Sequence, residues 1–121
     1  MTTKVLALEK DLFFAVKMRD TLRHYDIEVK TARNLSAFDE NLKETDGKEF
    51  VLAIVNTATI GVDWETAIRK ARNAGLKVLA FGSHMDLEAR SKALEAGAQR
   101  VVANSKFTSD MPGLVQRTLD E

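Results

Sequence analysis

Cysteine is absent from this chain of 121 residues, and histidine occurs only as His24 and His84. The lack of cysteine excludes disulfide bonds and thiol catalysis, and it fits a reducing cytoplasmic location. Two histidines without cysteine cannot form a His/Cys metal cluster, so we expect neither a metal nor a cofactor. No apolar run approaches the roughly 18 residues of a membrane span, and residues 1–4 lack the apolar core of a secretion signal.

An excess of charge of either sign is also missing. Lys and Arg together number 18, as do Asp and Glu, so the formal net charge is zero. A protein that binds nucleic acid usually carries a basic excess or a basic stripe, so we expect no direct nucleic-acid contact. The length suits one domain covering residues 1–121, and the sequence shows no repeat, low-complexity stretch or linker.

The chain is organised around an apolar stretch, residues 50–55, that ends at Asn56. Six consecutive apolar residues predict a strand that is buried on both faces. A loop of residues 57–61 follows, with Gly61 at its end. Ligand sites in open parallel sheets lie beyond the carboxyl ends of the strands, so Asn56 stands where a functional site is expected.

Strand and helix patterns alternate along the whole chain. Apolar or alternating runs predict strands, and apolar residues at helical spacing predict helices between them. We expect strands at 5–8, 27–32, 50–56, 78–81 and 101–103, a loop at 104–107, and helices at 12–25, 35–45, 64–73, from 83 or 86 to 96, and 109–119. Five strands alternating with five helices indicate an α/β fold, a flavodoxin-like doubly wound five-stranded parallel sheet with right-handed crossovers.

The helix boundaries have recognisable signals. Asp11, Asn34 and Asp63 are expected to cap helix N-termini, and Gly97 to end the helix before it. In the first helix we expect a core face made by four residues at helical spacing, namely Phe14, Met18, Leu22 and Tyr25. Phe13 and Val16 either widen this buried face or lie exposed at a partner surface.

The fourth helix has two distinct kinds of residue. Leu87 and Leu94 lie on one face, and a stripe of alanines can pack close to the sheet. Two pairs at i,i+4 spacing are expected to form ion pairs on the solvent side. The alanines are Ala89, Ala93 and Ala96, and the pairs are Asp86–Arg90 and Glu88–Lys92.

In this order of elements the chain resembles the receiver domain of bacterial two-component response regulators. Residues 89–98, which end in Ala96-Gly97-Ala98, resemble the family's passage from helix to strand. Residues 51–56 followed by Gly61 resemble its phospho-acceptor strand and loop. The resemblance covers nearly the whole chain and implies a (βα)5 receiver architecture.

The residues that carry receiver chemistry do not match. The acidic pair that holds Mg²⁺ in the family falls on Glu9 and Lys10, with Asp11 one place further on, and a lysine there places a positive charge where the metal binds. The acceptor aspartate falls on Asn56, whose amide is too poor a nucleophile to form an acyl phosphate. The three residues 9–11 are either a residual cation pocket or a local ion pair with a helix cap.

Further departures follow along the chain. The family's Thr or Ser falls on Gly82, with Ser83 next to it, and its switch aromatic falls on Val101. Its Lys-Pro pair falls on Asn104 and Ser105. With a shift of two residues Lys106 takes the lysine position, either paired with Glu9 across the sheet edge or simply exposed. Thr57 and Thr59 offer hydroxyls, but no base lies near them in sequence, so nucleophilic catalysis is not expected.

These departures predict a stand-alone pseudo-receiver that acts in signal transduction through protein–protein interaction, without Asp phosphorylation and without enzymatic activity. The resemblance points to the helix that starts near residue 86, the strand 101–103 and the last helix as the contact face for a partner or for self-association. The exposed stripe of the first helix comes second. Two alternatives stay open: an atypical phospho-receiver, and a flavodoxin-like binder of a small ligand.

Overall fold

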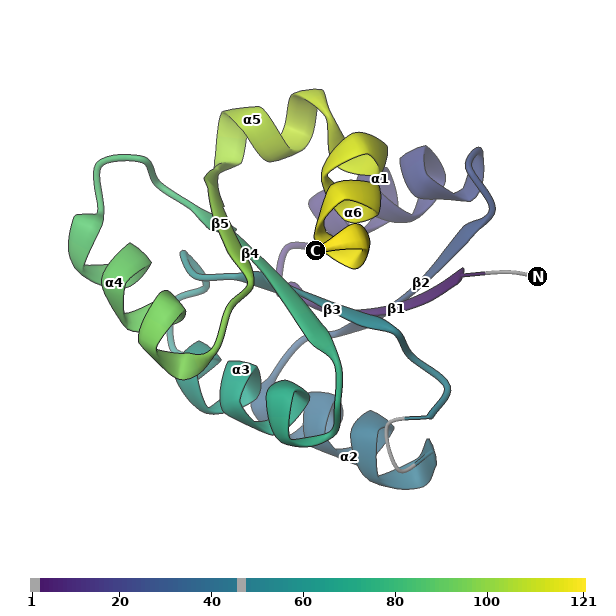
Figure 1. The fold of residues 1–121 in the computed structure, drawn as a ribbon, viewed down its shortest axis with the longest axis horizontal. Helices are drawn as coiled ribbons and strands as arrows, with labels where there is room; N and C mark the ends of the chain where they lie inside the picture. The colour runs from purple at the N-terminus through teal and green to yellow at the C-terminus, as the bar shows by residue number, and fades with distance from the viewer. Residues whose placement is uncertain (1–2, 46–47) are drawn as a thin grey trace.

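The computed structural model describes residues 3–45 and 48–121 and shows one parallel sheet between two layers of helices (Figure 1). The strands pair in the order β2-β1-β3-β4-β5, and every pairing is parallel. The strands are β1 (Thr3–Leu8), β2 (Ile27–Ala32), β3 (Leu52–Asn56), β4 (Lys77–Gly82) and β5 (Arg100–Ala103). The predicted α/β fold with a five-stranded parallel sheet is therefore confirmed.

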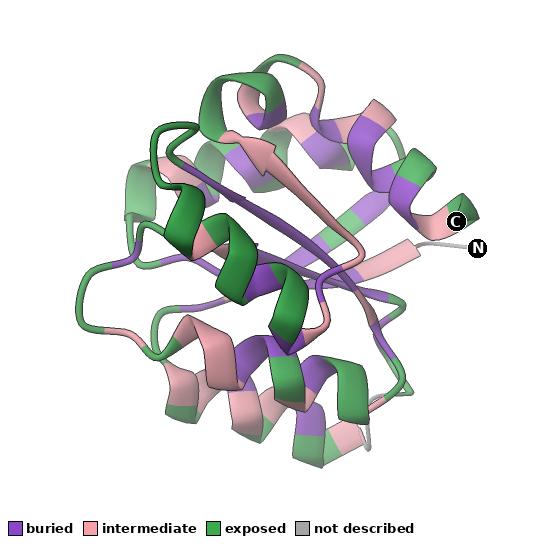
Figure 2. Cartoon of the chain, turned by 60° about the vertical axis from the view of Figure 1, so that its left-hand side comes forward, coloured by how far each residue is buried: buried purple, intermediate pink, exposed green. Residues whose placement is uncertain are grey.

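Helices cover both faces of the sheet. One layer holds α1 (Leu12–Arg23), α5 (Asn104–Ser109) and α6 (Met111–Asp120), and the other holds α2 (Leu35–Thr45), α3 (Trp64–Asn73) and α4 (Leu87–Ala96). Each layer packs on its own apolar cluster, which includes Met18, Phe107 and Leu114 on one side and Phe38 and Ile68 on the other. Burial of such side chains is the main stabilising term of the fold. Figure 2 shows that the buried residues gather on the strands and on the inner sides of the helices.

The predicted helix caps are present. The side-chain oxygens of Asp11, Asn34, Asp63 and Asp86 each accept a hydrogen bond from a backbone N–H in the first turn of the following helix, at 2.8–3.1 Å. Asp86, and not Ser83, is thus the residue that begins α4. Gly97 ends α4 with φ of 120°, in the left-handed region that favours glycine. Of the expected turn at 46–48, Asp46 and Gly47 lie outside the described residues.

The central strand is shorter than expected. The sequence predicts a strand from residue 50, whereas β3 begins at Leu52. Phe50 is buried, but Val51 is 46% exposed and donates its N–H to the carbonyl of Lys4 at 3.1 Å. An apolar run therefore did not mark where strand pairing begins, because the chain still turns toward the sheet at these two residues.

The exposed face of α1 also differs from the prediction. Met18 and Leu22 are fully buried and Phe14 packs partly against the same cluster, but Tyr25 follows the end of the helix and is 61% exposed. Phe13 is 90% exposed and Val16 is exposed as well, so they do not widen the buried face. Helical spacing identified the core stripe and overextended it by one turn.

The segment after β5 is a helix, not the expected loop. Residues 104–109 form α5. The side chain of its residue Phe107 is fully buried, and its ring stacks on that of Phe81 with 4.2 Å between the centroids. Phe14 lies beside both rings. The final helix then starts at Met111 rather than near Ser109, with Pro112 in its first turn as predicted. Burial of Phe107 stabilises a helical turn that the polar composition of this segment does not predict.

Of the predicted alanine stripe in α4, Ala93 and Ala96 are buried and Ala89 is half-buried, whereas Leu87 and Leu94 are exposed. In Figure 2 the outer side of this helix has the green colour of exposed residues. The expected pair Glu88–Lys92 forms at 3.0 Å. Arg90 forms no ion pair with Asp86 within the described part of the chain; its Nη1 instead donates to the carbonyl of Val101 at 3.3 Å.

Candidate functional site

Parallel pairing brings the carboxyl ends of β1, β3 and β4 to the same edge of the sheet. Glu9 follows β1, Asn56 ends β3 and Gly82 ends β4. Register pairs Leu8 with Val55 and Asn56 with Phe81, so the three residues lie side by side along this edge. The sequence correctly placed these positions at one edge, although it did not predict how their side chains interact.

Glu9 and Asn56 form the centre of the site. Nδ2 of Asn56 donates to both carboxylate oxygens of Glu9, at 2.9 and 3.1 Å, although Glu9 is only 2% exposed. The amide oxygen of Asn56 accepts a hydrogen bond from the backbone N–H of Ala58 at 2.9 Å. Asn56 thus uses both ends of its amide, and it links the first strand to the loop that follows the third.

Burial raises the pKa of the Glu9 carboxyl above its ordinary value of 4.5. Hydrogen bonds from Asn56 and from the backbone N–H groups of Asp11 and Lys10 favour the charged form and oppose this rise, whereas the nearby Asp11 carboxylate adds to it. An aspartate at position 56 would put a second acidic group against Glu9. The amide at this position is therefore well matched to a buried carboxylate.

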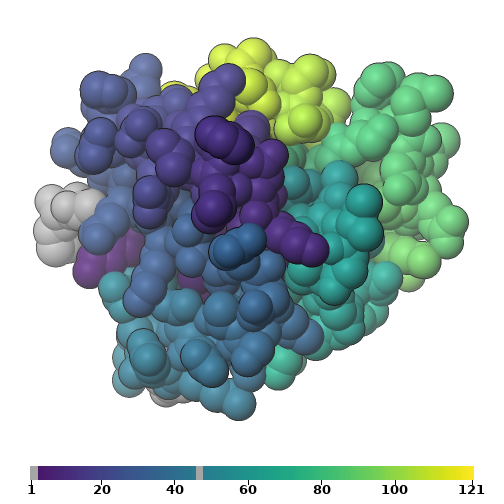
Figure 3. All heavy atoms as spheres, turned by 180° about the vertical axis from the view of Figure 1, so that it is seen from behind, coloured from purple at the N-terminus to yellow at the C-terminus, as the bar shows by residue number. Residues whose placement is uncertain are grey.

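Lys10 and Asp11 make different contacts. Asp11 caps α1 by accepting from the N–H groups of Phe13 and Phe14. Lys10 Nζ lies 3.5 Å from the carbonyl oxygen of Ile60, and among the described residues it forms no ion pair with Glu9. In Figure 3 purple spheres of the N-terminal part of the chain lie against teal spheres of its middle part. The predicted helix cap is therefore present, whereas the Glu9–Lys10 ion pair that was expected together with it does not form among the described residues.

Gly82 is matched to Thr57. A Cβ atom added at Gly82 would overlap Oγ1 of Thr57. Thr57 is held there because its N–H and its hydroxyl both donate to the carbonyl of Phe81, at 2.9 and 3.3 Å. The hydroxyl of Thr57 therefore fills the space that a side chain at the end of β4 would occupy.

This role of Thr57 was not predicted from the sequence. A usable signal was present, because the ends of two adjacent parallel strands carry a glycine on one and a β-branched residue just after the other. Register places Thr57 directly after the Asn56–Phe81 pair, beside Gly82. Only a known register would have turned this signal into a prediction.

Among the described residues, the side chains of the remaining expected positions form no hydrogen bond with Glu9 or Asn56. Ser83 is exposed, and its Oγ accepts from the N–H of Met85 at 3.2 Å. Asn104, Ser105 and Lys106 form the exposed first turn of α5. No ion pair between Lys106 and Glu9 occurs in residues 3–45 and 48–121, in agreement with the alternative that Lys106 is exposed. Val101 is half-buried in β5 beside α4.

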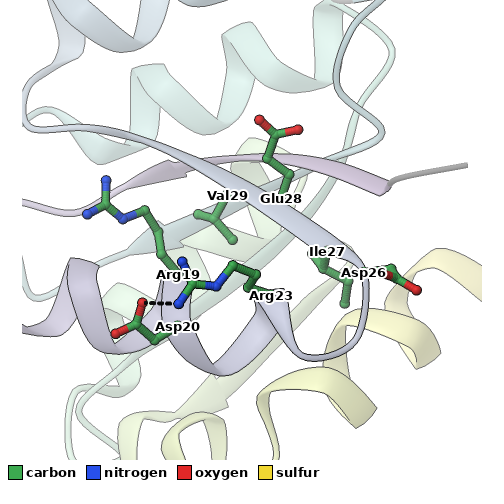
Figure 4. A pocket seen from close by; sticks show the side chains of 7 residues that line it. All are labelled: Arg19, Asp20, Arg23, Asp26, Ile27, Glu28 and Val29. Carbon is green, nitrogen blue, oxygen red and sulfur yellow. Dashed lines mark hydrogen bonds and ion pairs between the residues drawn. The ribbon is translucent and has the colours of Figure 1, made fainter.

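The described residues contain no group of three or more His, Cys, Asp or Glu side chains arranged to hold a metal ion. The same residues include no helix long and apolar enough to pass through a membrane. A hollow of about 540 Å³ lies elsewhere, between α1 and the edge strand β2 (Figure 4). Two arginines, Arg19 and Arg23, line it together with three carboxylates, one of which, Asp20, is bonded to Arg23 at 3.2 Å. This hollow is remote from the carboxyl edge of the sheet.

The sequence matches no protein-family model and no curated protein. Solved structures are similar in fold. A response regulator from Thermotoga maritima is 16% identical over 100% of both chains, with a TM-score of 0.83. A CheY-like response regulator receiver domain from Methanospirillum hungatei JF-1 is 19% identical over 99% of this chain and 95% of that chain, with a TM-score of 0.80.

The beryllofluoride-activated DrrB receiver domain is likewise similar, at 20% identity over 100% of both chains and a TM-score of 0.78. At such identities the likeness shows the fold. This fold is the flavodoxin-like receiver architecture that the order of elements and the local motifs predicted.

Proposed function

We propose that this chain is a pseudo-receiver, a signalling domain that recognises other proteins and does not accept a phosphoryl group on Asn56. The observation that carries the proposal is the double hydrogen bond from Asn56 to the buried Glu9. An aspartate acceptor needs a free carboxylate oxygen at this position, and here an amide bonds the neighbouring carboxylate instead. The fold of a receiver is combined with a site built for permanent internal contacts.

Three further features support this proposal. Lys10 places a cation beside Glu9 in the chain, where receivers bind Mg²⁺. Gly82 offers no hydroxyl at the end of β4, and Thr57 occupies the space beside it. Val101, at the position of the family's switch aromatic, has no aromatic ring. We therefore propose a domain without catalysis, working in the cytoplasm through contacts of its surface.

The surface formed by α4, β5 and the helices that follow is proposed as the first contact face, because the resemblance points to it and because Leu87 and Leu94 are exposed there. The stripe of Leu12, Phe13 and Val16 on α1 is the second. Exposed apolar groups that gather on one face are typical of protein contact sites.

The test is intact-mass measurement after incubation with acetyl phosphate and Mg²⁺. We expect no mass increase in the wild type, and none in Asn56→Asp, because Lys10 and Gly82 remain in that variant. A phosphorylatable receiver treated in parallel shows that the reagent is active. Addition of one phosphoryl group to any wild-type residue would contradict the proposal and favour the atypical phospho-receiver. Affinity capture and size-exclusion chromatography that find neither a partner nor self-association would also count against it.

A further inference from the structure

The open edge of the sheet at β5 is bordered by a continuous groove. A hollow of about 460 Å³ runs over β5 between α4 and α5, and a second of about 200 Å³ continues toward the carboxyl end of β4. Both are lined by Arg90 and by Val101, Val102 and Ala103 of β5. We call this feature the β5 groove; Figure 1 shows β5 at the edge of the sheet, with α4 and α5 on either side.

The charge of the β5 groove is positive. Arg90, Arg100 and Lys106 line it, against Asp86 and Glu121. Glu121 pairs with Arg100, and the Asp86 carboxylate accepts from the N–H of Ala89 as a helix cap. Within residues 3–45 and 48–121, neither Arg90 nor Lys106 has a carboxylate partner. Two cations therefore stand at the groove ready to bind carboxylates from another molecule.

Apolar side chains flank these cations. Leu87 and Leu94 are 72% and 47% exposed, and they lie with Arg90 on one face of α4. The floor is formed by the half-buried Val101 and Val102. The smaller hollow, about 200 Å³, lies below the range of about 300–1,000 Å³ that is usual for small-molecule sites. Its size suits one side chain of a partner better than a free cofactor.

The opposite edge of the sheet provides a contrast. The hollow along β2 in Figure 4 carries Arg19 and Arg23, but also Asp20, Asp26 and Glu28. Two arginines stand against three carboxylates there, so this hollow carries no excess of positive charge. In this respect it differs from the β5 groove.

We infer that the β5 groove binds an acidic, extended segment of a partner protein, with carboxylates at Arg90 and Lys106 and one large apolar side chain in the hollow beside Val101. The inference rests on the proposed function, since it names the kind of partner that such a domain would recognise. The groove floor is the edge of a strand, which extended peptides join readily. Four residues of β5 span about 13 Å, enough to align four or five residues of a partner.

Arg90 is well placed for this role. One of its nitrogens donates to the carbonyl of Val101, which fixes the side chain across the groove. A guanidinium has five N–H donors, so the others remain for a carboxylate. Complementary charge of this kind chiefly sets selectivity and rate of association.

The test is an amide NMR titration of the whole chain with short peptides. The probe is an Asp/Glu peptide with one central Phe, and two matched peptides replace Phe by Ala or the acidic residues by Lys. We expect the probe to shift amides of Arg90, Val101 and Lys106, with at least about tenfold weaker binding of both matched peptides. A double-stranded oligonucleotide serves as a polyanion of another class.

Charge reversal then locates the site. Arg90→Glu with Lys106→Glu should weaken probe binding by at least about tenfold, whereas Arg19→Glu with Arg23→Glu at the β2 edge should change it by less than about twofold. As a second variant, Leu94→Ala shortens a side chain that lines the groove and is 47% exposed, so the protein should still fold while probe binding weakens.

Four results would overturn the inference: no shifts at millimolar probe, shifts elsewhere on the surface, equal binding of the lysine peptide, or tighter binding of the oligonucleotide. None of them bears on the mass measurement with acetyl phosphate. Failure of the groove and failure of the proposed function can therefore be told apart.

Discussion

At the scale of single residues, Glu9 is the unusual group of this protein, a carboxylate that is almost fully buried and bonded to an amide. Its raised pKa means that the native state holds the proton more tightly than the unfolded chain does. The stability that this proton provides is fully present below the ordinary value of 4.5. It is lost as the pH rises through the higher native pKa.

Glu9→Gln removes this titration but keeps an oxygen that can accept from Asn56. We therefore expect the free energy of unfolding of the variant, relative to wild type, to increase as the pH rises from about 4 to neutrality, by about 1.4 kcal/mol for each unit by which the pKa is raised. Urea unfolding at a series of pH values measures it, with Glu28→Gln on the exposed side of β2 as control. If wild type instead gained stability relative to the variant over this range, Glu9 would have a lowered pKa.

Thr57 and Gly82 give a second prediction at the residue scale. Gly82→Ala places a methyl group against Oγ1 of Thr57, so we expect it to destabilise the protein by about 1–3 kcal/mol, as overpacked sites do. In Thr57→Ala the hydroxyl is gone, and the same change at Gly82 should then cost much less. A double-mutant cycle by urea unfolding measures the coupling. Additive effects of the two substitutions would show that they do not share the space.

At the scale of elements, the alternation of patterns was enough to predict the sheet, the order of helices and strands, and the caps at Asp11, Asn34 and Asp63. Capping depends on local sequence, which is why it can be predicted. The ends of elements were less predictable. Val51 is apolar yet exposed. The segment around Phe107 has a polar composition but is helical, because the buried Phe107 ring stacks on Phe81 and stabilises the turn.

The candidate site was also predictable only in part. Its positions could be predicted, since parallel strands bring Glu9, Asn56 and Gly82 to one edge. The contacts between its side chains could not be predicted, because the bond between Glu9 and Asn56 and the packing of Thr57 on Gly82 depend on strand register and side-chain rotamers. Sequence periodicity indicates which face is buried but does not determine either of these.

At the scale of the whole molecule, the proposed function implies a fixed scaffold rather than a switch. Movement between two states requires a ligand that binds one state better than the other. At this edge Asn56 is bonded to Glu9 and Ala58, Thr57 is bonded to Phe81, and Gly82 has no side chain to reposition. Asn56 and Thr57 at this edge are thus already hydrogen-bonded within the protein.

We therefore expect Mg²⁺ and then beryllofluoride to leave the amide NMR spectrum of this protein unchanged, around Glu9 and Asn56 as well as in β4, α4 and β5. The DrrB receiver domain, whose solved structure is beryllofluoride-activated, is the control that should respond in the same titration. Shifts clustered at Glu9, Asn56 and Ser83 would contradict the expectation, because they would require a pocket that still admits the metal and the phosphoryl mimic. An unchanged spectrum, together with peptide shifts at the β5 groove, would mean that recognition is built into the resting fold and needs no activation step.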